Sequence, residues 1–183
     1  FFTRLNETGE NQGEDIKISE TAVSEDSSIT WSGQEFGLVW RRGGPGSKIY
    51  FVRLDAKGKK QGDNIKVNNT GGASLSPSIT WDGSHYSIVW QGEDNDSERQ
   101  IYLTKLDQNG SKQSADLTLT SNSAGNYSLE PFFVWTGQEY GVAWQQGEGT
   151  IYFIRLDKNG NKKSNEQLIS DISQGKAKHP NIA

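Results

Sequence analysis

A unit of 50 to 54 residues recurs along this chain, and this repetition limits the possible folds more than any other feature of the sequence. The first half of each unit holds two Trp nine positions apart, with a Gly and an aromatic residue between them. The second half is a run such as I-Y-F-V-R-L-D, followed by a turn that contains Gly. The Trp pairs are Trp31 with Trp40, Trp81 with Trp90, and Trp135 with Trp144. The chain is therefore expected to build one structural unit several times.

Each unit predicts four short strands, A to D. Strands A and B are joined by tight turns at Gly33, Gly83 and Gly137, and strands C and D by turns such as Asn109-Gly110, a strong hairpin signal. Because successive side chains of a strand point to opposite faces, strand B has one face of large residues and one face of small residues. These two faces suit the stacking of one sheet on the next.

Strand D carries a Lys at its centre in the first copies, Lys17 and Lys66, which protects an exposed edge strand from pairing with another chain. Four-stranded sheets of about 50 residues, covered on both faces and protected at one edge, are typical of β-propeller blades. We therefore predict an all-β fold, a β-propeller segment of four-stranded antiparallel blades. Strands C and D of a split blade are expected at 1–19, full blades at 27–68, 77–120 and 130–170, and the first strand of a further blade at 180–183.

This division amounts to about three and a half blades, whereas closed propellers have about four to eight. Three completions of the ring remain open. The remaining blades lie in sequence beyond this chain, or two copies of the chain associate into one ring. In the third, the C-terminal strand joins the N-terminal strands in a four-bladed ring that lacks one strand.

The pattern P-S-I-x-W-x-G-x-x-Y-x-x-x-W, followed by I-Y-x-x-R-L-D-x-x-G, resembles the β-propeller repeats of large bacterial proteins, many of them surface or exported proteins. The resemblance covers nearly the whole chain. It implies the blade architecture and a location outside the cell or at the cell surface. It implies no particular activity, because the shared positions are those of the core and the turns.

Composition excludes several classes of protein. Aromatic residues make up 10% of the chain, which is incompatible with a disordered polymer. Charges of both signs are interspersed at a net charge of −4, so the basic patch that a nucleic-acid-binding protein needs is missing. No apolar stretch approaches the ~20 residues of a membrane-spanning helix. The sequence predicts no cofactor and no metal site.

The loops B–C and D–A lie on one rim and differ between copies, whereas the turns on the other rim are nearly constant. A fixed scaffold with variable loops commonly binds its ligand through those loops. We therefore expect a protein or glycan partner to contact this rim. Binding candidates are Arg41, Arg42, Asp94, Asp96, Glu98, Arg99, Tyr127 and Glu148 in or beside the loops, and Trp40, Trp90 and Trp144 at the ends of the B strands. For these Trp residues, a place in the core is the favoured interpretation and sugar stacking the alternative.

Motifs for catalysis are missing. The acidic run around Asp94 lacks the spacing of a calcium loop, and the chain has no Cys and no G-x-S-x-G motif. The two His, His85 and His179, have no metal-ligand partner nearby in sequence. The sequence thus predicts a non-catalytic binding or structural module. The alternative is a carbohydrate-active hydrolase or a sugar-binding lectin on the same scaffold, because glycosidases use dispersed carboxylates that sequence cannot pair.

Overall fold

The computed structural model describes residues 1–20, 23–69, 71–94, 97–122, 126–170, 173 and 175–182. Over these residues the chain forms three four-stranded antiparallel sheets, in the spatial orders β1-β2-β3-β4, β5-β6-β7-β8 and β12-β11-β10-β9. The prediction of an all-β, propeller-type segment is confirmed. The strands are β1 (Ser24–Trp31), β2 (Glu35–Arg42), β3 (Lys48–Asp55), β4 (Ile65–Lys66), β5 (Ser74–Trp81), β6 (Tyr86–Glu93), β7 (Arg99–Leu106), β8 (Leu117–Thr118), β9 (Ser128–Trp135), β10 (Tyr140–Gln146), β11 (Thr150–Leu156) and β12 (Gln167–Leu168).

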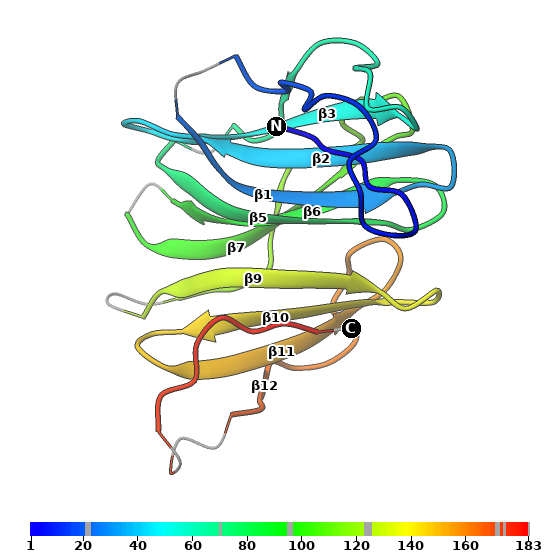
Figure 1. The fold of residues 1–183 in the computed structure, drawn as a ribbon. Coiled ribbons are helices and arrows are strands. Elements are labelled where there is room, and N and C mark those ends of the chain that lie inside the picture. The colour runs from blue at the N-terminus through cyan, green and yellow to red at the C-terminus, as the bar shows by residue number, and fades with distance from the viewer. Residues whose placement is uncertain are drawn as a thin grey trace.

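The three sheets lie one beside the next, with the first strand of each sheet toward a common centre. Strand β1 lies beside β5, and β5 beside β9, so these three strands form the inner wall of the molecule (Figure 1). The two-residue strands β4, β8 and β12 form the opposite edges. Among the described residues, no helix has the length and apolar character needed to cross a membrane.

The core lies between neighbouring sheets and depends on the large and small faces of the second strand of each sheet. Tyr86 of β6 is fully buried and packs on Gly37 of β2, where a Cβ atom would come within 2.5 Å of the Tyr86 ring. At the next junction, Tyr140 of β10 reaches Ser87 of β6, with 2.8 Å between their hydroxyl oxygens. A small residue on one sheet therefore receives a Tyr from the next.

The N-terminal residues occupy the place of a preceding sheet. Phe2 and Ile16 pair in an antiparallel bridge. Both side chains lie against Gly58, in the turn after β3. Gly110, at the same place in the second repeat, lies against Phe51 of the first sheet in the same way. The segment thus packs on the first sheet as each sheet packs on the next.

The C-terminal residues continue this arrangement on the other side. The amide of Ala177 donates to the carbonyl of Gly149, at 2.9 Å. An equivalent hydrogen bond runs from the amide of Ser74 in β5 to the carbonyl of Ser47, just before β3, also at 2.9 Å. The C-terminal segment therefore lies against the third sheet as β5 lies against the first.

The innermost strands begin earlier than expected. Strands β1, β5 and β9 start at Ser24, Ser74 and Ser128, whereas the sequence predicted blade starts at 27, 77 and 130. In each strand the register shifts by a bulge, between Glu25 and Ser28 in β1 for example. A bulge breaks the alternation of side chains on which the prediction depended. The sequence therefore assigned the first residues of these strands to the preceding loops.

Candidate functional site

The bulge in each innermost strand places one residue in the left-handed region of backbone conformation. Asp26, Ser76 and Glu130 have φ of 50°, 49° and 50°, and His179 of the C-terminal segment has φ of 52°. For residues other than Gly this region costs about 1–3 kcal/mol and is enriched at functional sites. Bulges near active sites also redirect side chains. The backbone geometry is a property of the repeat, whereas the side chain differs at every copy.

These four residues line one cavity of about 470 Å³, which we call the axial cavity. Its walls come from β1, β5, β9 and the C-terminal segment, four stretches far apart in the sequence. The remaining lining residues are hydroxyl-bearing or apolar: Ser27, Ser28, Pro77, Ser78, Pro131, Phe132 and Pro180. The volume lies within the range of small-molecule sites. The axial cavity is therefore a concave site with two carboxylates, Asp26 and Glu130.

Asp26 is held by groups from two sheets. Arg41 of β2 places Nε 3.0 Å from Asp26 Oδ2, and its guanidinium also pairs with Glu25. The backbone amide of Ser76 donates to the same Asp26 oxygen at 3.4 Å. Arg41, one of the candidates from the sequence, therefore contacts a residue that lines this site. Its charge is balanced by two acidic neighbours.

Glu130 has a separate basic partner. His179 Nδ1 lies 2.7 Å from Glu130 Oε2, and the Glu130 backbone amide donates to the side-chain oxygen of Gln91 at 3.1 Å. Gln91 is 4% exposed and fixes the strand from behind, while 38% of the Glu130 side chain is exposed. Each carboxylate of the axial cavity thus has one basic neighbour and an accessible surface.

The sequence prediction missed Asp26, Glu130 and His179. It assigned Asp26 to a variable loop and Glu130 to the first residue of a blade. A signal was present: a polar residue stands five positions before Trp31, Trp81 and Trp135 in all three full copies. The sequence does not reveal the bulge, so it gave no indication that the side chain at this position faces the centre of the molecule.

The acidic candidates around β6 and β7 hold their own loop. Asp94 accepts hydrogen bonds from the Glu98 amide at 2.9 Å and from the Gln100 side chain at 3.5 Å. Asp96 lies outside the described residues. None of the described residues of this loop lines the axial cavity. Across the described residues, no cluster of three or more His, Cys, Asp or Glu is arranged to bind a metal ion.

The other loop candidates contact residues that do not line the axial cavity. Arg99 pairs with Glu93 at 3.6 Å and lies over the ring of Tyr127, 5.7 Å from its centroid. Arg42 lies over Tyr50 at the same distance. Two exposed side chains, Glu148 and Lys176, form an ion pair at 2.5 Å. These residues form local pairs and not one shared site.

The Trp candidates are core residues. Trp40 is 4% exposed, and Trp90 and Trp144 are fully buried. Each stacks on a Tyr of the neighbouring strand, with ring centroids 6.0, 5.7 and 5.9 Å apart. They present no ring face to a ligand. The more exposed members of the pairs are the first ones, with Trp31 at 44% and Trp81 and Trp135 partly buried.

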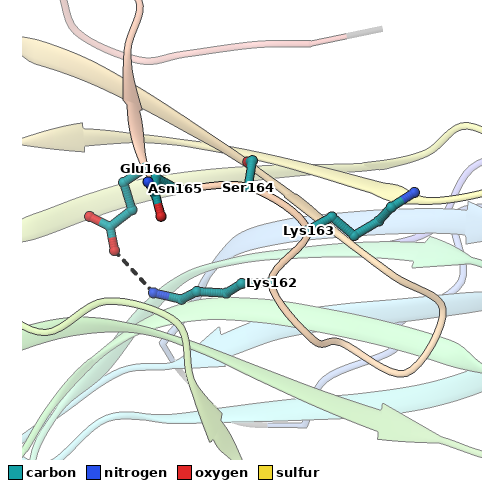
Figure 2. Close-up of a pocket in the computed structure, with 5 residues that line it drawn as sticks. All are labelled: Lys162, Lys163, Ser164, Asn165 and Glu166. Carbon is teal, nitrogen blue, oxygen red and sulfur yellow. Dashed lines mark hydrogen bonds and ion pairs between the residues drawn. The ribbon is translucent and has the colours of Figure 1, made fainter.

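A further hollow lies in the connection from β11 to β12 (Figure 2). Five consecutive residues line it, Lys162 to Glu166, and an ion pair of 3.2 Å joins the first to the last. Figure 2 shows Lys163 pointing away from this pair. Since no other element contributes, the hollow is the inner curve of one turn.

No protein-family model matches the sequence, and no curated protein sequence is similar enough to count as a relative. Solved structures do resemble the fold. A neuraminidase-like protein from A/bat/Guatemala/164/2009 has a TM-score of 0.57 at 15% identity, over 79% of this chain and 38% of that chain. The GH43_1 enzyme from Xanthomonas citri complexed with xylose has a TM-score of 0.58 at 10% identity, over 80% of this chain and 55% of that chain. A thermostable family-43 glycoside hydrolase has a TM-score of 0.58 at 9% identity, over 84% of this chain and 56% of that chain.

At these identities the likeness establishes a propeller-type fold, and this chain spans only about a third to a little over half of each similar structure. The likeness nevertheless overturns the main functional prediction. A non-catalytic module was expected, but the similar structures include glycoside hydrolases. The alternative from the sequence, a carbohydrate-active propeller, agrees better with these structures.

Proposed function

We propose that this chain forms part of a carbohydrate-active propeller in which the axial cavity binds a sugar and Asp26 and Glu130 act on its glycosidic bond. The observation that carries the proposal is the convergence of these two carboxylates on one cavity from two different sheets. Glycosidases generally use two carboxylates on either side of the scissile bond. Glycoside hydrolysis is thus the reaction that this arrangement supports best.

The two carboxylates have different neighbours, which supports different roles. Asp26 lies against the guanidinium of Arg41, a permanently charged group. This partner suits the carboxylate that activates water or stabilises the positive charge on the sugar ring. Glu130 lies against the imidazole of His179, a group that can both give and accept a proton. Glu130 is the better candidate for donating a proton to the leaving oxygen.

The rest of the lining also supports a sugar ligand. Ser27, Ser28, Ser76 and Ser78 bring hydroxyl-bearing residues, and the prolines with Phe132 bring apolar surface. Ligand sites commonly combine apolar walls with a few polar groups. A sugar ring presents both kinds of surface, with hydroxyls at its edge and C–H groups on its faces.

The test uses the full chain and a panel of aryl glycosides of neutral pentoses and hexoses, together with an aryl sialoside. Asp26→Asn and Glu130→Gln are each expected to lower kcat/KM on the hydrolysed glycoside by roughly a hundredfold. The control is Glu148→Gln, which removes an exposed carboxylate outside the axial cavity and is expected to leave the rate unchanged. Thermal melts of all three variants verify the fold.

Two results would contradict the proposal. One is full activity in both carboxylate variants. The other is a wild-type chain that neither hydrolyses any glycoside of the panel nor shows chemical-shift changes at Asp26 or Glu130 when the free sugars are titrated.

A further inference from the structure

A second cavity, of about 480 Å³, lies between the first and second sheets at the opposite ends of the strands, and we call it the turn-rim groove. Its lining includes Gln34 from the turn between β1 and β2, Glu35 at the start of β2, and Arg53 from β3. Trp81, Gly83, Tyr86, Gln108 and Asn109 line it from the second repeat. Five residues of β1 separate Asp26 from this end of the strand, or roughly 17 Å at the rise of a strand. The turn-rim groove is therefore distinct from the axial cavity.

The corresponding junction between the second and third sheets shows why this groove is open. There, a buried Asp82 receives the Tyr140 hydroxyl at 2.5 Å and Lys105 Nζ at 2.9 Å. In the first repeat Ser32 stands at the position of Asp82, and its hydroxyl donates to the Glu35 carbonyl of its own turn at 2.9 Å. Ser32 is short and bonds within its own turn, so it leaves space where the next junction has the Asp82 carboxylate.

The charged side chains in the groove are fixed before any ligand arrives. Glu35 accepts from the Tyr86 hydroxyl at 2.9 Å, and Arg53 lies 3.3 Å from the same Glu35 oxygen. Arg53 also donates to the backbone carbonyl of Gln108 at 3.0 Å. The two charged side chains are only 19% and 23% exposed. Such a rigid pair offers a hydrogen-bond acceptor and a donor side by side, with little entropy left to lose on binding.

From this lining we infer that the turn-rim groove binds a neutral oligosaccharide. Vicinal hydroxyls of a sugar can donate to Glu35 and accept from Arg53, and Trp81 supplies an aromatic surface next to them. Gln34 and Asn109 add exposed amides that can both donate and accept. Gly83 leaves open space beside its backbone, because no atom lies within 4 Å of the position that a Cβ atom would occupy.

The charge of the lining selects the class of sugar. Glu35 and Arg53 are its charged members, and they pair with each other, so the groove is electrically neutral as a whole. An anionic sugar such as a sialate would find no uncompensated positive charge there. A neutral pentose or hexose chain does not need one.

The experiment titrates xylotriose, cellotriose and maltotriose into the full chain and follows the indole N–H signals by nuclear magnetic resonance. It is done in an Asp26→Asn/Glu130→Gln background, so that the axial cavity no longer carries its carboxylates and the two proposals fail independently. At least one neutral trisaccharide is expected to shift the Trp81 signal. The double variant Gln34→Ala/Gln108→Lys removes two side-chain amides and introduces at position 108 the residue type of Lys158, its equivalent in the third repeat. It is expected to weaken that binding about tenfold.

The matched control is Gln138→Ala, the same turn position as Gln34 in the third repeat, which is expected to bind as the parent does. Several outcomes would overturn the inference. They are unchanged affinity in the Gln34→Ala/Gln108→Lys variant, no shift of the Trp81 signal with any neutral trisaccharide, and tighter binding of sialyllactose or of an acidic or basic peptide than of all three neutral sugars.

Discussion

Asp82→Ala is expected to lower the free energy of unfolding by about 3–5 kcal/mol, because it removes one partner from a buried charged cluster. The Asp82 side chain is fully buried in the turn between β5 and β6. It accepts the Tyr140 hydroxyl at 2.5 Å and pairs with Lys105 Nζ at 2.9 Å. The backbone amides of Ser84 and His85 also donate to it, at 2.9 and 2.7 Å. Without the carboxylate, an ammonium group that is largely buried loses its counter-charge.

Urea denaturation of the wild type and the variant measures this loss. The control is Glu139→Ala, which removes a carboxylate of the third sheet whose two cationic partners, Arg155 and Lys163, are exposed to solvent. Surface ion pairs contribute little, so this control is expected to stay near the wild-type midpoint. Equal destabilisation by the two variants would show that the junction between the second and third sheets does not depend on Asp82.

The same carboxylate predicts a pH dependence. Burial alone would raise the pKa of Asp82, but the hydrogen bonds from Tyr140, Lys105 and the turn amides outweigh it and lower the pKa to about 2. Because the unfolded value is 3.8, the stabilisation is complete above about pH 4 and is lost as the pH falls toward 2. One unit of pKa difference between the folded and unfolded states corresponds to about 1.36 kcal/mol. The lowered pKa of Asp82 therefore contributes about 2 kcal/mol to the free energy of unfolding.

Comparison with Asp82→Asn isolates this contribution to the pH dependence. The variant has no carboxylate to titrate, so its stability is expected to fall less steeply than that of the wild type between pH 4 and pH 2. Burial and the Asp82 carboxylate also raise the pKa of Tyr140, so its hydroxyl remains a donor throughout this range. Parallel curves for the two proteins would contradict the assignment.

The periodic part of the fold could be predicted from the sequence, since it depends on local patterns. Alternation in β2 placed Gly37 on a small face, and the structure has Tyr86 of the next sheet against it. The bond between Asp82 and Tyr140 could not be predicted in this way, because 58 positions separate the two residues. Equivalent copies also differ: Tyr86 reaches Glu35, whereas Tyr140 reaches Asp82.

The candidate site was predictable only in part, for a related reason. Loop variability pointed to residues such as Arg99 and Tyr127, which form a local pair. The cavity instead depends on strand residues, Asp26 and Glu130, whose direction is set by a bulge. A bulge changes which way a side chain points without changing the residue types around it, so it leaves little trace in a pattern. Among the candidates that the structure describes, Arg41 contacts a residue that lines this site.

Gly37→Ala is expected to destabilise the protein by about 2 kcal/mol, within the usual range for overpacking a core. In an unobstructed strand the same change would be slightly stabilising, because Gly loses more conformational freedom on folding than Ala. Here the new Cβ atom would lie 2.5 Å from Cε1 and 2.6 Å from Cδ1 of Tyr86. The sign of the effect therefore reports on the contact between the sheets.

The Tyr86 ring has little room to retreat. It is fully buried, its centroid lies 5.0 Å from that of Phe51 and 4.7 Å from that of Trp81, and its hydroxyl donates to Glu35. Any displacement that relieves the clash at Gly37 also disturbs those three contacts. Moving the whole second sheet outward would instead open the junction along its length.

Gly141→Ala is the matched control, because Gly141 has the same place in the third sheet. The nearest atom to its new Cβ would be a Phe153 ring carbon at 3.1 Å, so a shift of a few tenths of an ångström relieves the contact. We expect the free energy of unfolding of this variant, measured by urea denaturation, to stay within about 1 kcal/mol of the wild-type value. Gly141→Ala should therefore be clearly more stable than Gly37→Ala. Similar losses at the two positions would mean that the small face of the second strand is needed within each sheet. A loss confined to Gly37 would establish that it is needed to receive the Tyr of the next sheet.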